Sequence, residues 1–215
     1  MQAALDAGLE LIEQFVCEGA SPCVAPGEVH FMSQNTLERV STTVTPQKVL
    51  GVFAMQTPDL SALVAMSPMH SSEAQWILVA DRVADPGNLG TIIRTADWFG
   101  IQHIFCAPGT TDYLSPKVIH ASMASAFRVQ LHYQELAPMI KKYADQTYGT
   151  YMDGTDFEQI DPKQMQFLVL GHEGHGISDN LTALLKHRIG IPQKGRAESL
   201  NVAVAAGILL QHLSK

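Results

Sequence analysis

Long apolar runs, clustered cysteines and an excess of basic residues are all missing from this 215-residue sequence. No window reaches the roughly 20 apolar residues that a membrane-spanning helix needs. Met1-Gln-Ala-Ala lacks the basic segment that begins a signal peptide. The three cysteines, Cys17, Cys23 and Cys106, have no metal-ligand spacing. We therefore expect reduced thiols in a cytoplasmic protein, with no membrane partner and no metal site.

Charge is also scarce, and its balance is acidic. Charged residues make up 16% of the chain, and the formal net charge is −7. This balance argues against a broad basic surface for nucleic acid. Hydrophobic residues at 46% and aromatic residues at 7% suit an ordinary soluble core, and the length suits one domain, or one domain with a small appendage.

From Trp76 onward, apolar runs of strand length alternate with helical segments. This alternation predicts an α/β fold, with a parallel sheet covered by helices on both faces. Strands are expected at 76–80, 101–107, 127–131, 148–152, 167–170 and 188–191, and helices at 89–99, 136–146, 179–186 and from Val202. Ligands of such sheets bind beyond the carboxyl ends of the strands.

Residues 1–57 have a different character. They contain the end of a helix at 3–9, strands at 11–17 and 49–55, a loop at 18–27 and a short helix from Ser33. That is too little to bury an independent core, so we expect a partial α+β module. Residues 58–74, with Pro58 and Pro68, indicate a linker with a short helix before a main domain at 75–215.

The C-terminal helix is the most apolar segment. Ser199 is a good N-cap before the uncharged run from Val202 to Leu210. A helix that is apolar all round is expected to be buried all round, in a core or an interface. Ser199 and Asn201 stand at its start, where free backbone N–H groups can bind a ligand.

Three polar or glycine-rich stretches follow expected strand ends. They are Asp85-Pro-Gly-Asn-Leu-Gly with Arg94, Gly171-His-Glu-Gly-His-Gly, and Ile191-Pro-Gln followed by Ser199-Leu-Asn. Each is weak alone, because a capped helix or a polar loop looks similar. The second is neither the dinucleotide Gly-x-Gly-x-x-Gly nor the His-Glu-x-x-His of zinc proteases. Since all three follow strand carboxyl ends, we expect them to meet.

Together and in this order, the three stretches resemble the motifs of the SpoU/TrmH group of SPOUT-class RNA methyltransferases. The resemblance covers residues 75–215, and residues 1–57 resemble the second half of the small RNA-binding module that precedes the catalytic domain in many members. It implies a C-terminal trefoil knot, a homodimer with its site at the subunit interface, and S-adenosylmethionine as cofactor. The implied reaction is methyl transfer to a ribose 2′-hydroxyl of structured RNA, with rRNA favoured over tRNA.

The resemblance also implies roles for single residues. Arg94 matches the arginine that activates the hydroxyl. A guanidinium rarely deprotonates in a protein, so we expect Arg94 to be an electrostatic clamp first and a general base second. Asn88 and Asn201 would position the ribose and the loop, Glu173 would fix Arg94 or the site loop, and Ser199 completes the expected catalytic set. The cofactor is expected at Met152, Asp153, Gly154, Leu170, Gly171, Gly176, Ile191, Pro192, Gln193, Ser199 and Leu200.

Two alternatives remain open. One is a catalytically silent RNA-binding relative, and the other is a dehydrogenase-like enzyme with a nucleotide cofactor, against which the missing Gly-x-Gly-x-x-Gly counts. A local basic cleft is still possible in an acidic protein, because six cations lie in or between the motifs. They are Arg82, Arg94, Lys117, Arg128, Lys194 and Arg196. Ala124 and Ser125 follow Ser122-Met, where many relatives carry Gly.

Overall fold

The computed structural model describes residues 1–41, 45–55, 76–160 and 166–213. The chain divides into two compact units, with the boundary between Thr57 and Pro58. The helix expected within 58–74 lies outside the described residues.

The first unit is built on a small sheet. Its elements are α1 (Gln2–Asp6), β1 (Leu11–Cys17), β2 (Glu28–Met32), α2 (Gln34–Val40) and β3 (Val49–Phe53). The strand order is β2-β1-β3, with β1 parallel to β2 and antiparallel to β3. Ser33 caps α2 by accepting a hydrogen bond from the Thr36 N–H at 3.3 Å. Strand β2 was not expected, because it is short and half polar and follows a Pro/Gly-rich loop.

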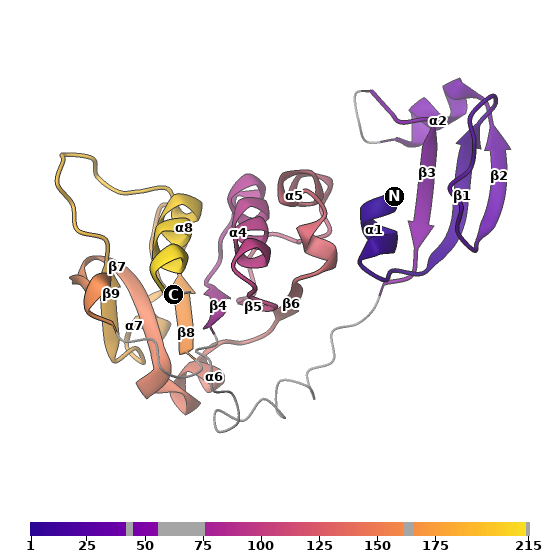
Figure 1. Cartoon of the computed structure of the whole chain (residues 1–215). Helices are drawn as coiled ribbons and strands as arrows, with labels where there is room; N and C mark the ends of the chain where they lie inside the picture. The colour runs from indigo at the N-terminus through magenta and orange to yellow at the C-terminus, as the bar shows by residue number, and fades with distance from the viewer. Residues whose placement is uncertain (42–44, 56–75, 161–165, 214–215) are drawn as a thin grey trace. The chain divides into compact units, whose positions relative to one another are not determined.

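The second unit contains a six-stranded sheet with the order β6-β5-β4-β8-β7-β9 (Figure 1). All neighbouring strands in it are parallel, as predicted. The strands are β4 (Trp76–Ala80), β5 (His103–Cys106), β6 (Gln130–Tyr133), β7 (Thr147–Asp156), β8 (Gln166–Leu170) and β9 (His187–Gly190). The helices are α4 (Pro86–Trp98), α5 (Pro116–Ser122), α6 (Ala137–Lys142), α7 (Asp179–Thr182) and α8 (Val202–Leu213), and the short 3₁₀ turns are η1 (Ser125–Phe127), η2 (Ala144–Gln146) and η3 (Phe157–Gln159).

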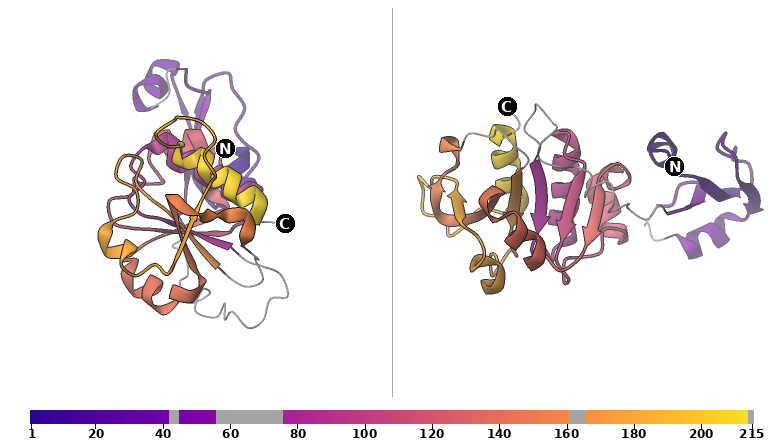
Figure 2. Two further views of the ribbon diagram at one scale, coloured as in Figure 1. Left: turned by 90° about the vertical axis from the view of Figure 1, so that its left-hand side faces the viewer. Right: turned by 90° about the horizontal axis from the view of Figure 1, so that it is seen from below.

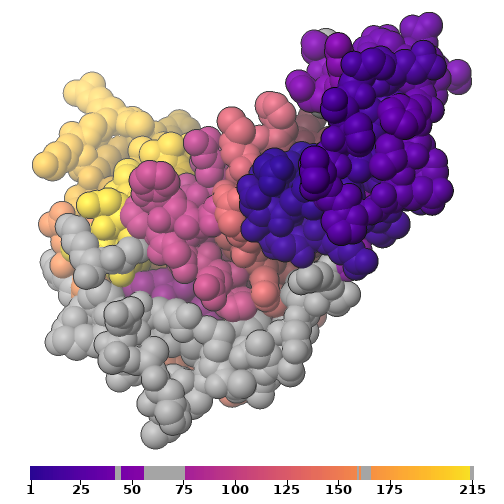
Figure 3. Space-filling model, turned by 45° about the vertical axis from the view of Figure 1, so that its right-hand side comes forward, coloured from indigo at the N-terminus to yellow at the C-terminus, as the bar shows by residue number. Residues whose placement is uncertain are grey.

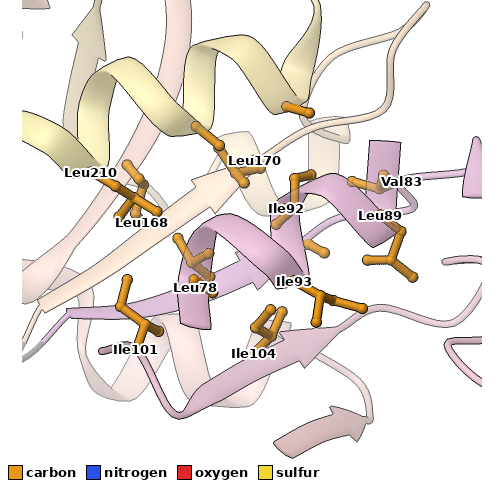
Figure 4. Close-up of a cluster of buried hydrophobic side chains, with 14 of the residues drawn as sticks. Leu78, Val83, Leu89, Ile92, Ile93, Ile101, Ile104, Leu168, Leu170 and Leu210 are labelled. Carbon is orange, nitrogen blue, oxygen red and sulfur yellow. The ribbon is translucent and has the colours of Figure 1, made fainter. Parts of the chain in front are cut away.

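Helices cover both faces of this sheet (Figure 2). Successive side chains of a strand point to opposite faces. In β4, Leu78 packs with the core under α4, α5 and α8, whereas Ile77 and Val79 pack with the core under α6 and α7. Figure 4 shows the first of these cores, where Ile92 and Ile93 of α4 and Leu210 of α8 lie against the strands. This layering sets the starts of α4 and α8 beside the sheet's carboxyl edge.

Several element boundaries differ from the predictions. The strand expected at 127–131 begins only at Gln130, because Met123 and Ala124 adopt left-handed backbone with φ of 51° and 69° and lead into η1. This conformation favours glycine, so it is unusual for methionine and alanine. The expected helix 136–146 divides into α6 and η2, and the one expected at 179–186 ends as α7 at Thr182. Helix α5 was not predicted from the sequence.

Helix α8 corrects two expectations. Its N-cap is Asn201, whose Oδ1 accepts hydrogen bonds from the N–H groups of Ala203 at 2.9 Å and Val204 at 3.3 Å, so the cap predicted at Ser199 was wrong. The helix is also not buried all round. Leu209 and Leu210 are buried, but Val204 is 52% and Ile208 37% exposed. One face of α8 packs on α4 and the sheet, and the opposite face is open in a single chain.

A buried histidine pair predicts how stability depends on pH. His103 Nδ1 and His132 Nε2 lie 3.2 Å apart, and the ring of His132 stacks on Phe105. Burial lowers the pKa of both imidazoles, to about 4 for His132. These folded pKa values lie below the unfolded value. The contribution of the neutral histidine pair to folding stability is therefore complete above about pH 6.5 and is lost as pH falls towards 4.

We expect His132 alone to cost roughly 2 kcal/mol of unfolding free energy between pH 7 and pH 5. Urea titrations of the wild type and of His132→Gln at both pH values measure this, since glutamine keeps a hydrogen-bonding group but cannot become charged. His120→Gln is the control, because His120 is exposed. An equal loss of stability in His132→Gln and in the wild type would contradict the assignment.

Candidate active site

The three motifs come together at the carboxyl ends of β4 and β8. Asp81, directly after β4, is buried, and its Oδ2 accepts a hydrogen bond from the Ser178 N–H at 2.6 Å. The Asp81 N–H in turn donates to the Leu170 carbonyl at 2.8 Å. Asp81 thus ties the first motif to the loop after β8. It received no role from the sequence, although an acid directly after a buried strand is a usable signal.

Glu173 is the anionic centre of the site. Its carboxylate accepts hydrogen bonds from the N–H groups of Ala84 and Asp85, both at 3.2 Å, and from Asn88 Nδ2 at 2.9 Å. Burial alone would raise the pKa of Glu173, but these hydrogen bonds, led by that from Asn88, hold its pKa below the usual value. Glu173 is therefore ionised at neutral pH and fixes the turn that starts α4.

Asn201 joins the third motif to the other two. Its Nδ2 donates to Asn88 Oδ1 at 2.8 Å, while its Oδ1 caps α8. Asn88 thus donates to Glu173 and accepts from Asn201 with the same amide. We call Glu173, Asn88 and Asn201 the three-motif network. The structure brings these three expected site residues together, as the sequence suggested for the motifs.

Arg94 and Ser199, the other two expected catalytic residues, lie outside this network. Arg94 is six residues beyond Asn88, about 9 Å along the axis of α4, and is exposed. The side chains of Arg94 and Ser199 have no hydrogen bond or ion pair within the described ranges. The alternative that Glu173 fixes the loop therefore fits the structure, and the alternative that it fixes Arg94 does not.

Of the six basic side chains in or between the motifs, two are paired with an acid and four are not. Arg82 Nε lies 3.3 Å from Asp81, and Arg128 Nε donates to Asp97 Oδ2 at 3.0 Å. Arg94, Lys117, Lys194 and Arg196 are exposed and, in the part of the chain that the structure describes, have no ion-pair partner. These four remain available to an anionic ligand.

The segments expected to hold a cofactor lie at the same carboxyl edge. A Cβ on Gly154 would lie 2.2 Å from the Ile189 carbonyl carbon, which brings 152–154 against the end of β9. A Cβ on Gly171 would lie 2.3 Å from the Gly176 carbonyl carbon, so Leu170 and Gly171 pack against the end of their own loop. Glycine is needed at both positions because backbone approaches backbone.

The loop from Pro192 to Asn201 is exposed throughout. The Gln193 side chain bonds within it, donating to the carbonyls of Gly195 at 3.1 Å and Ala197 at 2.6 Å. Within the described residues, the backbone N–H groups of Ile191, Ser199 and Leu200 have no hydrogen-bond partner. Free backbone donors, next to turns where glycine lets backbone pack closely on backbone, fit a ligand that is held mainly by backbone groups.

Neither a metal cluster nor a membrane helix is found among the described residues. No group of three or more His, Cys, Asp or Glu side chains there is placed to share a metal ion. No helix among them combines the length and apolar character needed to cross a bilayer.

Comparison with known proteins gives a consistent result. The family model described as "SpoU rRNA Methylase family" matches residues 75–211. A protein of Bacillus subtilis (strain 168) named 23S rRNA (guanosine(2553)-2'-O)-methyltransferase RlmP is 32% identical over 190 residues, covering 86% of this chain and 72% of the relative.

Two solved structures resemble the chain over nearly its whole length. The AdoMet-bound rRNA methyltransferase from Sinorhizobium meliloti is 30% identical, with a TM-score of 0.83 over 99% of this chain and 84% of that one. The SpoU methyltransferase AviRb from Streptomyces viridochromogenes has a TM-score of 0.84 at 23% identity, over 99% and 85%, which shows similarity of fold alone. With the family model matching most of the second unit, this chain belongs to the SpoU rRNA methylase family.

Proposed function

We propose that this protein is an S-adenosylmethionine-dependent methyltransferase that acts in the cytoplasm on a ribose 2′-hydroxyl of structured RNA, rRNA in preference to tRNA. The observation that carries the proposal is the three-motif network of Glu173, Asn88 and Asn201 at the carboxyl edge of the sheet. Support comes from the family, from the 2'-O activity in the name of the Bacillus subtilis relative, and from the AdoMet-bound Sinorhizobium meliloti structure.

The residues of this chain fit that reaction in separate roles. Bound S-adenosylmethionine supplies an electrophilic methyl group on a sulfonium. The task of the chain's own residues would be to orient the ribose oxygen towards that methyl group. Arg94, with an unpaired guanidinium, orients this oxygen and its neighbouring phosphate and stabilises the developing negative charge.

The network residues hold the loops that surround the substrate. Glu173 keeps its charge close to the Asn88 amide, and Asn88 and Asn201 fix the starts of α4 and α8 relative to each other. The cofactor would be held by residues 152–154, 170–171, 176, 191–193 and 199–200. In the last two of these segments, the backbone N–H groups of Ile191, Ser199 and Leu200 have no hydrogen-bond partner among the described residues. We also propose that the C-terminal segment forms the trefoil knot that the family resemblance implies.

The experiment is titration calorimetry with S-adenosylmethionine and with NAD, followed by methyl transfer from tritiated S-adenosylmethionine to total RNA. Binding of NAD alone would favour the nucleotide-cofactor alternative. Binding of RNA without methyl transfer would favour a silent relative. Mapping 2′-O-methylation in the RNA of a deletion strain then identifies the nucleotide, and loss of a base-methyl mark there would contradict the ribose assignment.

We further propose a homodimer whose interface covers the open face of α8. Val204 and Ile208, four residues apart on α8, are 52% and 37% exposed, and Leu200, just before the helix, is 50% exposed. Trp98 on α4 is 85% exposed, and α4 and α8 lie side by side at the surface (Figure 3). Large exposed apolar side chains on two neighbouring helices are typical of an interface. Because Arg94 lies on the exposed side of α4, a second copy would also enclose it.

Ile208→Glu is expected to turn the dimer into a folded monomer, since it places a charge in the proposed interface without touching the core. Light scattering with circular dichroism measures mass and folding together. Leu209→Glu is unsuitable, because Leu209 is 1% exposed and its replacement would disrupt the fold. Val24→Glu is the matched control, as Val24 is fully exposed in the other unit. A wild-type monomer at micromolar concentration would contradict the dimer.

The first unit is proposed to contact the RNA substrate, but weakly. Residues 1–57 hold six acidic and only two basic side chains. Each neutralised phosphate contributes about 0.7 to 0.9 to the slope of log K against log salt. We therefore expect a shallow slope, corresponding to a few phosphate contacts per protomer, when a structured rRNA fragment is titrated over a salt series. Nanomolar affinity at physiological salt with a slope near about ten would contradict this expectation.

A further inference from the structure

Strand β7 leaves its register with β9 just where the cofactor segment lies. Ile189 of β9 faces both Thr150 and Thr155 of β7, so residues 151–154 form an excursion from the ladder. Gly154 closes this excursion against Ile189 and Gly190. An excursion of this kind needs side-chain support, because its backbone is no longer held by the regular ladder.

Arg188, the neighbour of Ile189 in β9, supports the excursion through two contacts. Its Nη2 donates to Asp153 Oδ1 at 2.7 Å. Its guanidinium carbon also lies over the Tyr151 ring, 3.7 Å from the ring centre, which is a cation–π contact. One side chain therefore holds both the first and the third residue of the excursion.

The support continues into the second motif. Tyr151 Oη donates to Thr182 Oγ1 of α7 at 2.9 Å. Thr182 Oγ1 in turn donates to the Ile177 carbonyl at 3.4 Å, at the end of the loop that contains Glu173. Side chains thus connect β9, the excursion of β7 and the second-motif loop.

We propose that Arg188 is a positioning residue for the cofactor cradle, acting through Asp153 and Tyr151 on the backbone of 152–154. This inference rests on the proposed function. The Asp153 carboxylate is committed to Arg188, so Asp153 supports the cofactor by placing backbone and makes no direct side-chain contact to it. Arg188 itself touches no reacting group.

The exposure of the Arg188–Asp153 ion pair indicates that the pair positions local backbone and adds little to the stability of the whole fold. The Arg188 and Asp153 side chains are 44% and 77% exposed, and ion pairs this exposed add little to folding stability. Lys186 and Asp145 form a matched pair just before β9, with the same 2.7 Å distance and exposures of 57% and 84%. That second pair lies outside the predicted cofactor segments, so Lys186→Ala controls for the loss of an exposed ion pair.

The test is a double-mutant cycle with Arg188→Ala, Asp153→Ala and the double variant. S-adenosylmethionine affinity is measured by calorimetry, and KM and kcat by methyl transfer to RNA. We expect each single variant to weaken S-adenosylmethionine binding and to raise the KM for S-adenosylmethionine about tenfold. The double variant should lose little more affinity than either single variant. In all three variants, kcat at saturating substrate should stay within about twofold of wild type. Melting temperatures and Lys186→Ala should match the wild type. Arg188→Lys should restore only part of the affinity, because it keeps the charge and loses the planar stack.

Two outcomes of the mutant cycle would overturn the proposal. One is wild-type affinity in Arg188→Ala. The other is a loss in Asp153→Ala with no loss in Arg188→Ala, which would mean that Asp153 contacts the cofactor directly. Hydrogen exchange without ligand gives an independent readout: amides at 152–154 should exchange faster in Arg188→Ala and not in Lys186→Ala. Failure of the wild type to bind S-adenosylmethionine would refute the proposed function, whereas unchanged exchange would refute the positioning role alone.

Discussion

Arg94→Ala is expected to lower the turnover of methyl transfer by about a thousandfold while the cofactor binds within about twofold of wild type. Removing one preorganised donor to a developing negative charge typically costs about 10²–10³ in rate, and Arg94 has the further task of orienting the hydroxyl. Cofactor binding should survive because Arg94 lies on α4, apart from the backbone segments proposed to hold it. Single-turnover methylation and calorimetry measure the two quantities separately.

The controls for Arg94 use charge and position. Arg39→Ala removes another exposed helical arginine, from the first unit, and should change turnover only a few-fold at most. Arg94→Lys distinguishes an electrostatic clamp from a general base. If residue 94 only stabilises charge, the lysine variant should keep part of the rate, with an unchanged pH profile. A lysine acting as general base would make the rate rise with pH towards its pKa near 10. Near-normal turnover in Arg94→Ala would remove the residue from the mechanism.

Gly154→Ala is expected to produce the second large effect, loss of cofactor binding together with reduced stability. The added methyl would lie 2.2 Å from the Ile189 carbonyl carbon, 2.4 Å from its oxygen and 2.6 Å from the Gly190 nitrogen. Backbone atoms cannot rotate away as a side chain can, so the end of β9 must separate from β7. Overpacking of this kind costs about 1–3 kcal/mol, and here the displaced backbone belongs to two proposed cofactor segments.

Gly195→Ala is the matched control for Gly154→Ala. Its new methyl would have no neighbour within 4 Å, and its φ is not in the left-handed range. Thermal melting and S-adenosylmethionine titration of both variants should show a loss in Gly154→Ala alone. Equal affinities would mean that the excursion of β7 does not contribute to the cofactor site.

The parallel sheet was predictable because its physics is local. Residues 76–80 are a continuous apolar run, and in the structure all five are buried between two helical layers. The meeting of Asn88, Glu173 and Asn201 was only suggested, because the partners are 85 and 113 residues apart and no local preference encodes such pairing. The residues pair because their strand ends share one edge of the sheet.

The errors have equally specific causes. Ser199 and Asn201 are both good N-caps, and the choice between them is made by Asn88, whose Oδ1 accepts a hydrogen bond from Asn201 and fixes it at the start of α8. Periodicity could show that α8 is apolar but not that Val204 and Ile208 stay uncovered, because the covering surface belongs to tertiary structure. The Arg188 contacts were missed because the break in register of β7 leaves no clear mark on the sequence.

The exposed loop between β9 and α8 has a consequence for proteolysis. Lys194 and Arg196 stand in it without partners among the described residues, so both peptide bonds that follow them are accessible to trypsin-like enzymes. A cut there would break the covalent connection between α8 and the rest of the chain, but Leu209, Leu210 and Leu213 would remain buried in the shared core. The nicked protein would then consist of two complementing fragments held by packing alone, and the short one would carry Asn201 away from Asn88 if it dissociated.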